Sequence, residues 1–122
     1  STPEAWGVDP ARIVIAGDSA GANLTAAMIH DLMGQGGAMP AGQALIYPAV
    51  DTRMNSASMM ALKDAYVLPV ERINWYLDLY LPEDQDRSDP RVAPIFSDRL
   101  AGQPEAMIVV GGHDPLWDDG QV

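Results

Sequence analysis

The chain has 122 residues, of which 17 are acidic and 7 basic, so its formal net charge is −10. This length suits one domain, or a segment of a larger one. The acidic balance leaves no basic face for a nucleic-acid backbone, and no apolar run approaches the roughly 18 residues that span a bilayer. Cysteine is absent, which excludes disulfides, thiolate metal sites and a cysteine nucleophile.

Three short apolar runs predict the strands of the fold. They show no alternation and are bounded by turn residues, as in strands buried on both faces, and they cover residues 12–16, 43–47 and 106–110. A helical pattern over residues 20–33 separates the first two. Strands and helices in this order predict an α/β fold with three parallel strands. Without outer neighbours, these strands would expose apolar edges and faces.

The segments between and around the strands give weaker signals. Pro3 is typical of a helix start, and Asp9-Pro10 predicts a turn. A helix with one apolar face is predicted to begin at Pro69, and residues 82–94 read as a polar loop. Near the end of the chain, Asp118 or Asp119 is predicted to cap a further helix.

Residues 51–66 are predicted to be irregular. Three methionines here are interpreted as core or pocket fillers: Met54, Met59 and Met60. Two tyrosines of the following helix, Tyr76 and Tyr80, are interpreted as packing residues on one helix face. Two histidines and scattered carboxylates form no metal-binding pattern, so no metal site is predicted.

The chemistry-bearing motif is Gly17-Asp18-Ser19-Ala20-Gly21, which matches G-x-S-x-G. It lies between a predicted strand and a predicted helix, the placement that a nucleophile elbow requires. A serine on so sharp a turn takes a strained backbone conformation, and the flanking glycines leave room for strand and helix. The alternative is an ordinary N-capping serine at a strand–helix junction.

Asp114 is the candidate partner of this serine. It follows the last predicted strand, and carboxylates at the carboxyl end of parallel strands lie on the edge where α/β active sites form. Serine before aspartate is the chain order of the α/β-hydrolase triad. Taken alone, Asp114-Pro115 predicts only a turn. In a chain that also has the serine elbow, Asp114 is a candidate triad acid.

These segments together resemble the hormone-sensitive-lipase-like esterases of the α/β-hydrolase fold, also called bacterial family IV carboxylesterases. The resemblance covers essentially residues 1–122 and rests on RIVIAGDSAGANLTAAM, LIYPAVD and the stretch SDPRVAPIFSDRLAGQPEAMIVVGGHDPLWDDG. It implies Ser19 as nucleophile, Asp114 as triad acid and the Ala20 backbone as oxyanion-hole donor. It also implies that residues 51–82 contribute to the region covering the acyl pocket. The family usually has glycine where this chain has Ala22.

Two functional segments of that family have no counterpart in these residues. The resemblance places an HGG-type oxyanion loop before Ser19 and the catalytic histidine after Asp114. His30 lies 11 residues along a helix from the serine, about 16 Å away, and His113 adjoins Asp114. Neither suits the role of catalytic base. We therefore expect residues 1–122 to be the central part of one larger hydrolase domain, inactive alone and completed by a companion fragment or a homo-oligomer.

The sequence thus predicts a serine carboxylic-ester hydrolase, acting on small-molecule esters of short to medium chain length without a cofactor. Two alternatives stay open. One is an amidase or deacetylase on the same fold, and the other is a catalytically dead ligand-binding protein of this fold. No signal-peptide pattern is visible, and the expected compartment is the cytoplasm. No membrane span and no nucleic-acid partner are expected.

Overall fold

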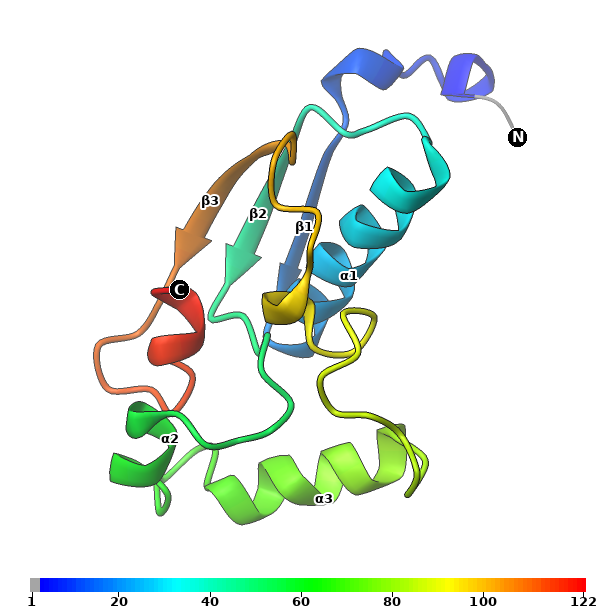
Figure 1. Cartoon of the computed structure of the whole chain (residues 1–122). Coiled ribbons are helices and arrows are strands. Elements are labelled where there is room, and N and C mark those ends of the chain that lie inside the picture. Colours follow the sequence, from blue (N-terminus) through cyan, green and yellow to red (C-terminus); the bar gives the residue numbers. More distant parts are fainter. Residues whose placement is uncertain (1–2) are drawn as a thin grey trace.

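The computed structural model describes residues 3–122 and contains a three-stranded parallel sheet. The strands are β1 (Val14–Asp18), β2 (Gly42–Ile46) and β3 (Glu105–Val109), in the order β1-β2-β3. Their register pairs Gly17 with Leu45 and Leu45 with Ile108. All three carboxyl ends therefore lie at one edge of the sheet, which faces α2 and α3 (Figure 1). The predicted α/β class and parallel sheet are confirmed.

The main helix, α1 (Ala20–Gln35), follows β1 directly and packs against β1 and β2 (Figure 1). Its small residues allow a close approach, and Ala22 and Ile29 are fully buried. It ends at Gln35, and Gly36 caps it: the left-handed backbone of Gly36 lets its N–H donate to carbonyl groups of the last turn. The helix thus runs two residues beyond the predicted end.

The prediction that the strands are buried on both faces is wrong for β1 and β3. Every residue of β3 is exposed, and Val14 of β1 is 59% exposed. The reason is that α1 covers one face of β1 and β2 and does not extend over β3. Only β2, the central strand, holds buried side chains such as Leu45. The expectation of exposed apolar sheet residues is confirmed.

The first strand begins two residues later than predicted. A 3₁₀ turn over Pro10–Arg12 occupies the start of the predicted run, and the Asp9 carboxylate accepts its Ala11 N–H at 3.0 Å. The predicted helix start at Pro3 is a 3₁₀ turn, Pro3–Trp6. The strand that follows these turns ends at Asp18, directly before Ser19.

A second small core lies beyond the carboxyl edge of the sheet. α2 (Ala57–Ala61), inside the segment predicted to be irregular, begins where Ser56 accepts the Met59 N–H. The predicted helix is present as α3 (Val70–Tyr80), which begins one residue later than predicted because Pro69 occupies its N-cap position. Met59, Ile73 and Leu116 form the buried cluster between these helices and the C-terminal segment. Met60 is 65% exposed, so its interpretation as a filler is wrong.

The predicted polar loop over residues 82–94 contains neither helix nor strand up to the 3₁₀ turn Pro94–Phe96. The stretch after it is held to α1 by His30. The His30 ring bonds Ser97 Oγ through Nδ1 and Arg99 Nη1 through Nε2, each at 2.7 Å. Since a guanidinium only donates, Nε2 accepts and Nδ1 carries the proton that Ser97 accepts. Both ring nitrogens are therefore occupied far from Ser19.

Candidate active site

Ser19 lies at the junction of β1 and α1 with a backbone conformation that L residues rarely adopt. Its φ is 52° and its ψ is −116°, outside the allowed regions for a side chain of this type. Hydrogen bonds hold the turn: the Ser19 N–H donates to Ile46 O at 2.9 Å, and its carbonyl accepts the N–H groups of Ala22 and Asn23. The strained elbow predicted from the motif is present. Such strain is typical of functional positions.

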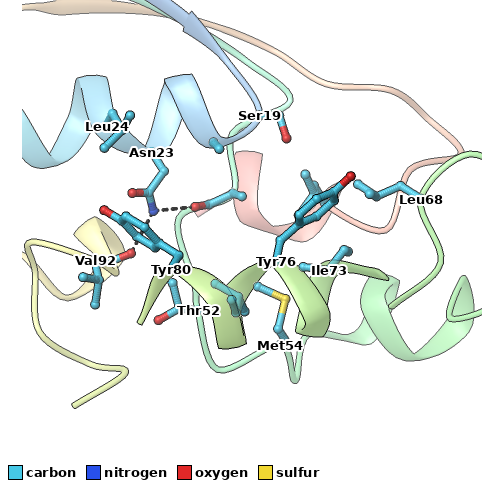
Figure 2. A pocket seen from close by; sticks show the side chains of 14 residues that line it. Ser19, Asn23, Leu24, Thr52, Met54, Leu68, Ile73, Tyr76, Tyr80 and Val92 are labelled. Atoms are coloured by element: carbon cyan, nitrogen blue, oxygen red, sulfur yellow. Dashed lines mark hydrogen bonds between the residues drawn. The ribbon is translucent and has the colours of Figure 1, made fainter. Parts of the chain in front are cut away.

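The alternative of an ordinary capping serine does not hold. Ser19 occupies the N-cap position of α1, yet its side chain makes no capping hydrogen bond. The hydroxyl group is instead directed away from the helix backbone, into the space beside α3 (Figure 2). Ala20 is the first residue of α1, so its N–H has no intrahelical acceptor.

The two glycines of the motif differ in the space around them. A methyl group on Gly17 would overlap the Gly21 carbonyl and lie 2.7 Å from the Ala22 nitrogen. At Gly21, the nearest atom to an added methyl is an Asp18 carboxylate oxygen at 3.9 Å, an ordinary contact. The expectation that both glycines provide necessary space is therefore correct for Gly17 and wrong for Gly21.

We expect Gly17→Ala to destabilise the protein by about 3 kcal/mol or more, since backbone must move to admit the methyl group. Gly21→Ala is the matched control, and at a helical position it should be neutral or stabilising by up to about 1 kcal/mol. Urea unfolding of both variants checks this. Equal loss of stability in the two would contradict the close approach of β1 to α1.

An apolar cavity of about 480 Å³ opens beside Ser19. Figure 2 shows Ser19 and Asn23 on one side and Ile73, Tyr76 and Tyr80 rising from α3 on the other. The segment 52–80 supplies half of the wall: Thr52, Met54, Leu68, Ile73, Tyr76, Leu77 and Tyr80. Tyr76 and Tyr80 are each more than half exposed and line the cavity. They are therefore not the packing residues predicted.

Asp114 lies after β3, at the same edge of the sheet as Ser19. Its side chain is half-buried and accepts the Leu116 N–H at 2.9 Å. β2 separates the strands that carry these two residues, and among residues 3–122 no hydrogen bond joins their side chains. His113 is exposed beside Asp114, and His30 is engaged elsewhere.

The turn that carries Asp114 is anchored to the segment after β2. Asp119 is buried and accepts the N–H groups of Val50 and Asp51 at 2.9 and 3.0 Å. Asp118 accepts the Ser58 N–H at 2.7 Å, and Ser58 Oγ donates to the Pro115 carbonyl.

The prediction of a capping Asp118 or Asp119 is wrong: a 3₁₀ turn, Asp118–Gly120, forms with Trp117 at its N-cap.

An ion pair between Arg53 and Asp51 lies beside Thr52 of the cavity wall. The Arg53 guanidinium donates to Asp51 from Nε to Oδ1 at 2.9 Å and to Oδ2 at 3.3 Å, and from Nη2 to Oδ2 at 2.7 Å. These bonds lower the pKa of Asp51, against the opposing effect of its burial. The Arg53 guanidinium also lies over the Phe96 ring, 4.2 Å from its centre. Asp51 therefore stays ionised next to the buried Asp119.

Burial raises the pKa of Asp119 from 3.8 to about 6, and the two N–H donors offset part of this rise. A carboxyl group with a raised pKa in the folded state stabilises the fold below pH 4, and this contribution is lost as pH rises through 6. Asp119→Asn keeps an acceptor and removes the titration. We expect it to gain up to about 3 kcal/mol relative to the wild type between pH 4 and pH 7.

Urea unfolding at pH 4, 5 and 7 measures this difference. Asp98→Asn removes a charge from an exposed carboxylate (81% exposed) and serves as the control. Parallel stability profiles of wild type and Asp119→Asn would show that Asp119 does not titrate in this range.

Among the described residues, no helix is both long enough and apolar enough to cross a membrane, and no group of three metal-ligating side chains occurs. The functional candidates that the structure describes are the Ser19 elbow and Asp114, at one edge of the sheet, and the apolar cavity beside Ser19. A parallel sheet with a serine elbow after one strand and a carboxylate after another is the arrangement of the α/β hydrolases.

Comparison with known proteins agrees with this class. A family profile described as the alpha/beta hydrolase fold matches residues 1–122, and the chain belongs to this family. It is 36% identical over 121 residues to the carboxylic ester hydrolase LipN of Mycobacterium tuberculosis, covering 95% of this chain and 32% of LipN. It is 30% identical to the ethyl acetate hydrolase of Pseudomonas putida, over 96% of this chain and 37% of that hydrolase.

A solved structure confirms the resemblance to hormone-sensitive-lipase-like esterases. The hormone-sensitive lipase from a metagenome library superposes with a TM-score of 0.87 at 34% identity, over 98% of this chain and 39% of that one. The chain spans about a third of the length of the curated relatives it matches, 32% of LipN and 37% of the ethyl acetate hydrolase.

Proposed function

We propose that the protein hydrolyses carboxylic esters through an acyl-enzyme formed on Ser19. The observation that carries this proposal is the conformation of Ser19: a positive φ on a strand–helix turn and an uncapped hydroxyl facing an apolar cavity. A serine that serves only to cap a helix has no need of such a backbone. The ester hydrolases among the relatives support the same reaction.

In the proposed mechanism, Ser19 Oγ attacks the ester carbonyl carbon and its proton passes to a histidine. Asp114 orients that histidine, which then protonates the departing alcohol. Water, deprotonated by the same histidine, attacks the acyl carbon and releases the acid. The Ala20 N–H, free at the start of α1, donates to the oxyanion of each tetrahedral intermediate, where the helix N-terminus also favours negative charge.

The cavity beside Ser19 is the proposed acyl site. Residues between 51 and 82 are proposed to contribute to its cover. This is supported by the cavity wall, to which they supply half of the lining residues and which consists mainly of aliphatic and aromatic side chains. Such a wall binds alkyl groups by removing apolar surface from water. Together with the ethyl acetate hydrolase among the relatives, this supports esters of short to medium chain length as substrates.

The catalytic histidine and the oxyanion loop are proposed to come from polypeptide outside residues 1–122. His30 and His113 are both unsuited to the role, one by its bonds to Ser97 and Arg99 and the other by its position beside Asp114. Loss of the triad base lowers kcat by about 10⁶-fold. Residues 1–122 alone are therefore proposed to be inactive, whether the missing groups come from the same chain, a companion fragment or a second copy.

Turnover of p-nitrophenyl butyrate and of the matching anilide tests the proposal. The gene product that carries residues 1–122 with their flanking sequence should hydrolyse the ester, and residues 1–122 alone should not. Hydrolysis of the anilide in preference to the ester would point to an amidase. Binding of the ester without turnover by the longer protein would point to a ligand-binding protein and overturn the proposal.

A further inference from the structure

Asn23 lies one helical turn after Ser19 on α1, and its backbone N–H donates to the Ser19 carbonyl at 3.1 Å. Its side chain is buried, with 6% exposed. Nothing in the G-x-S-x-G motif requires an asparagine at this position. The residue nevertheless forms the connection between the elbow and the cavity.

The Asn23 side-chain amide uses both of its protons. Nδ2 donates to the Ala49 carbonyl at 2.7 Å and to the Val92 carbonyl at 2.8 Å (Figure 2). Ala49 belongs to the segment after β2, and Val92 to the turn before Pro94–Phe96. The acceptors are 26 and 69 residues away in sequence. One amide group therefore joins three separate segments.

All three residues line the cavity together with Ser19. Each carbonyl that Asn23 binds thus belongs to a residue that lines the cavity, and the donor belongs to the helix that begins at the nucleophile elbow. A change in the amide would move the wall and the first turn of α1 relative to each other. A buried carbonyl left without its donor is unfavourable, so the segments would rearrange.

We propose that Asn23 is a positioning residue, which fixes the Ser19 elbow relative to the acyl cavity through its two amide protons. This inference rests on the proposed esterase function. Its effect is on kcat more than on stability, because a misplacement of about 1 Å between nucleophile and bound carbonyl costs about 10²-fold in rate.

Asn23→Asp is the test variant, because it keeps the shape and replaces the two donors by an acceptor that faces two carbonyl oxygens. In the full-length protein we expect kcat for p-nitrophenyl butyrate to fall about 10²-fold. Asn74→Asp makes the same chemical change on α3, at a half-buried residue outside the cavity lining. Its kcat should match the wild type.

A role in stability alone is separated by His30→Ala. This variant removes the bonds to Ser97 and Arg99 from the other end of the same helix. Both variants should have a lower Tm, and well below either Tm only Asn23→Asp should lose kcat. If Asn23→Asp does not fold, Asn23→Ser, which keeps one donor, replaces it with an expected loss of about tenfold.

The outcomes separate the inference from the function on which it rests. An inactive wild type overturns the proposed function and the role of Asn23 with it. An active wild type, with kcat of folded Asn23→Asp or Asn23→Ser within about threefold of it, overturns the role of Asn23 only. Equal kcat losses in the Asn23 variant and His30→Ala would assign the effect to stability and likewise overturn the positioning role.

Discussion

Replacing Ser19 by alanine is expected to lower kcat for ester hydrolysis by about 10⁶-fold in the full-length protein, since the acyl-enzyme then has no oxygen on which to form. Stability should change little, because the Ser19 side chain makes no capping hydrogen bond. Initial rates with p-nitrophenyl butyrate, and Tm by calorimetry, measure the two effects separately.

Another serine provides the control. Ser58 donates to the Pro115 carbonyl on the turn that follows Asp114, so Ser58→Ala should lower stability by about 1 kcal/mol and leave most of the activity. Retention of more than about a hundredth of the wild-type kcat by Ser19→Ala would exclude Ser19 as the nucleophile.

Replacing Asp114 by asparagine is expected to lower kcat by about 10⁴-fold, because an amide cannot hold the catalytic histidine in the required tautomer. The asparagine oxygen can still accept the Leu116 N–H, which Asp114 Oδ1 accepts at 2.9 Å. The turn should therefore keep its shape, and binding of substrate should be nearly unchanged.

Asp118→Asn is the matched control, four residues along the same segment, where the carboxylate accepts the Ser58 N–H. Steady-state kinetics of both variants give the comparison. Similar losses of kcat in the two would show that the turn as a whole matters and that Asp114 has no particular role as triad acid.

The elbow could be predicted from the sequence because its determinants are local. An apolar run, a glycine, the serine and a helical pattern follow one another within residues 12–33, and the backbone strain at Ser19 arises from that succession. The parallel sheet could be predicted for a similar reason, since each strand is a short apolar run. The exposure of every residue of β3 could not be predicted from its apolar run, because the burial of a strand depends on what packs against it.

The cavity and its supports depend on contacts between distant residues. Asn23 binds Val92, 69 residues away, and Asp119 binds Val50 across the same separation. An asparagine within a helical pattern and an aspartate near a turn carry no signal of such partners. Tyr76 and Tyr80 line the cavity together with Ile73 of the same helix, and an apolar helix face in the sequence does not tell a cavity wall from a packed core.

The most direct test of the central claim is mass spectrometry of the full-length protein after reaction with an alkyl fluorophosphonate. This reagent forms a stable bond to a serine oxygen that an adjacent base has activated. We predict one adduct, on the peptide that contains Ser19, and its loss in Asp114→Asn under the same brief exposure. An unmodified Ser19 peptide, or an adduct on another serine, would contradict the account.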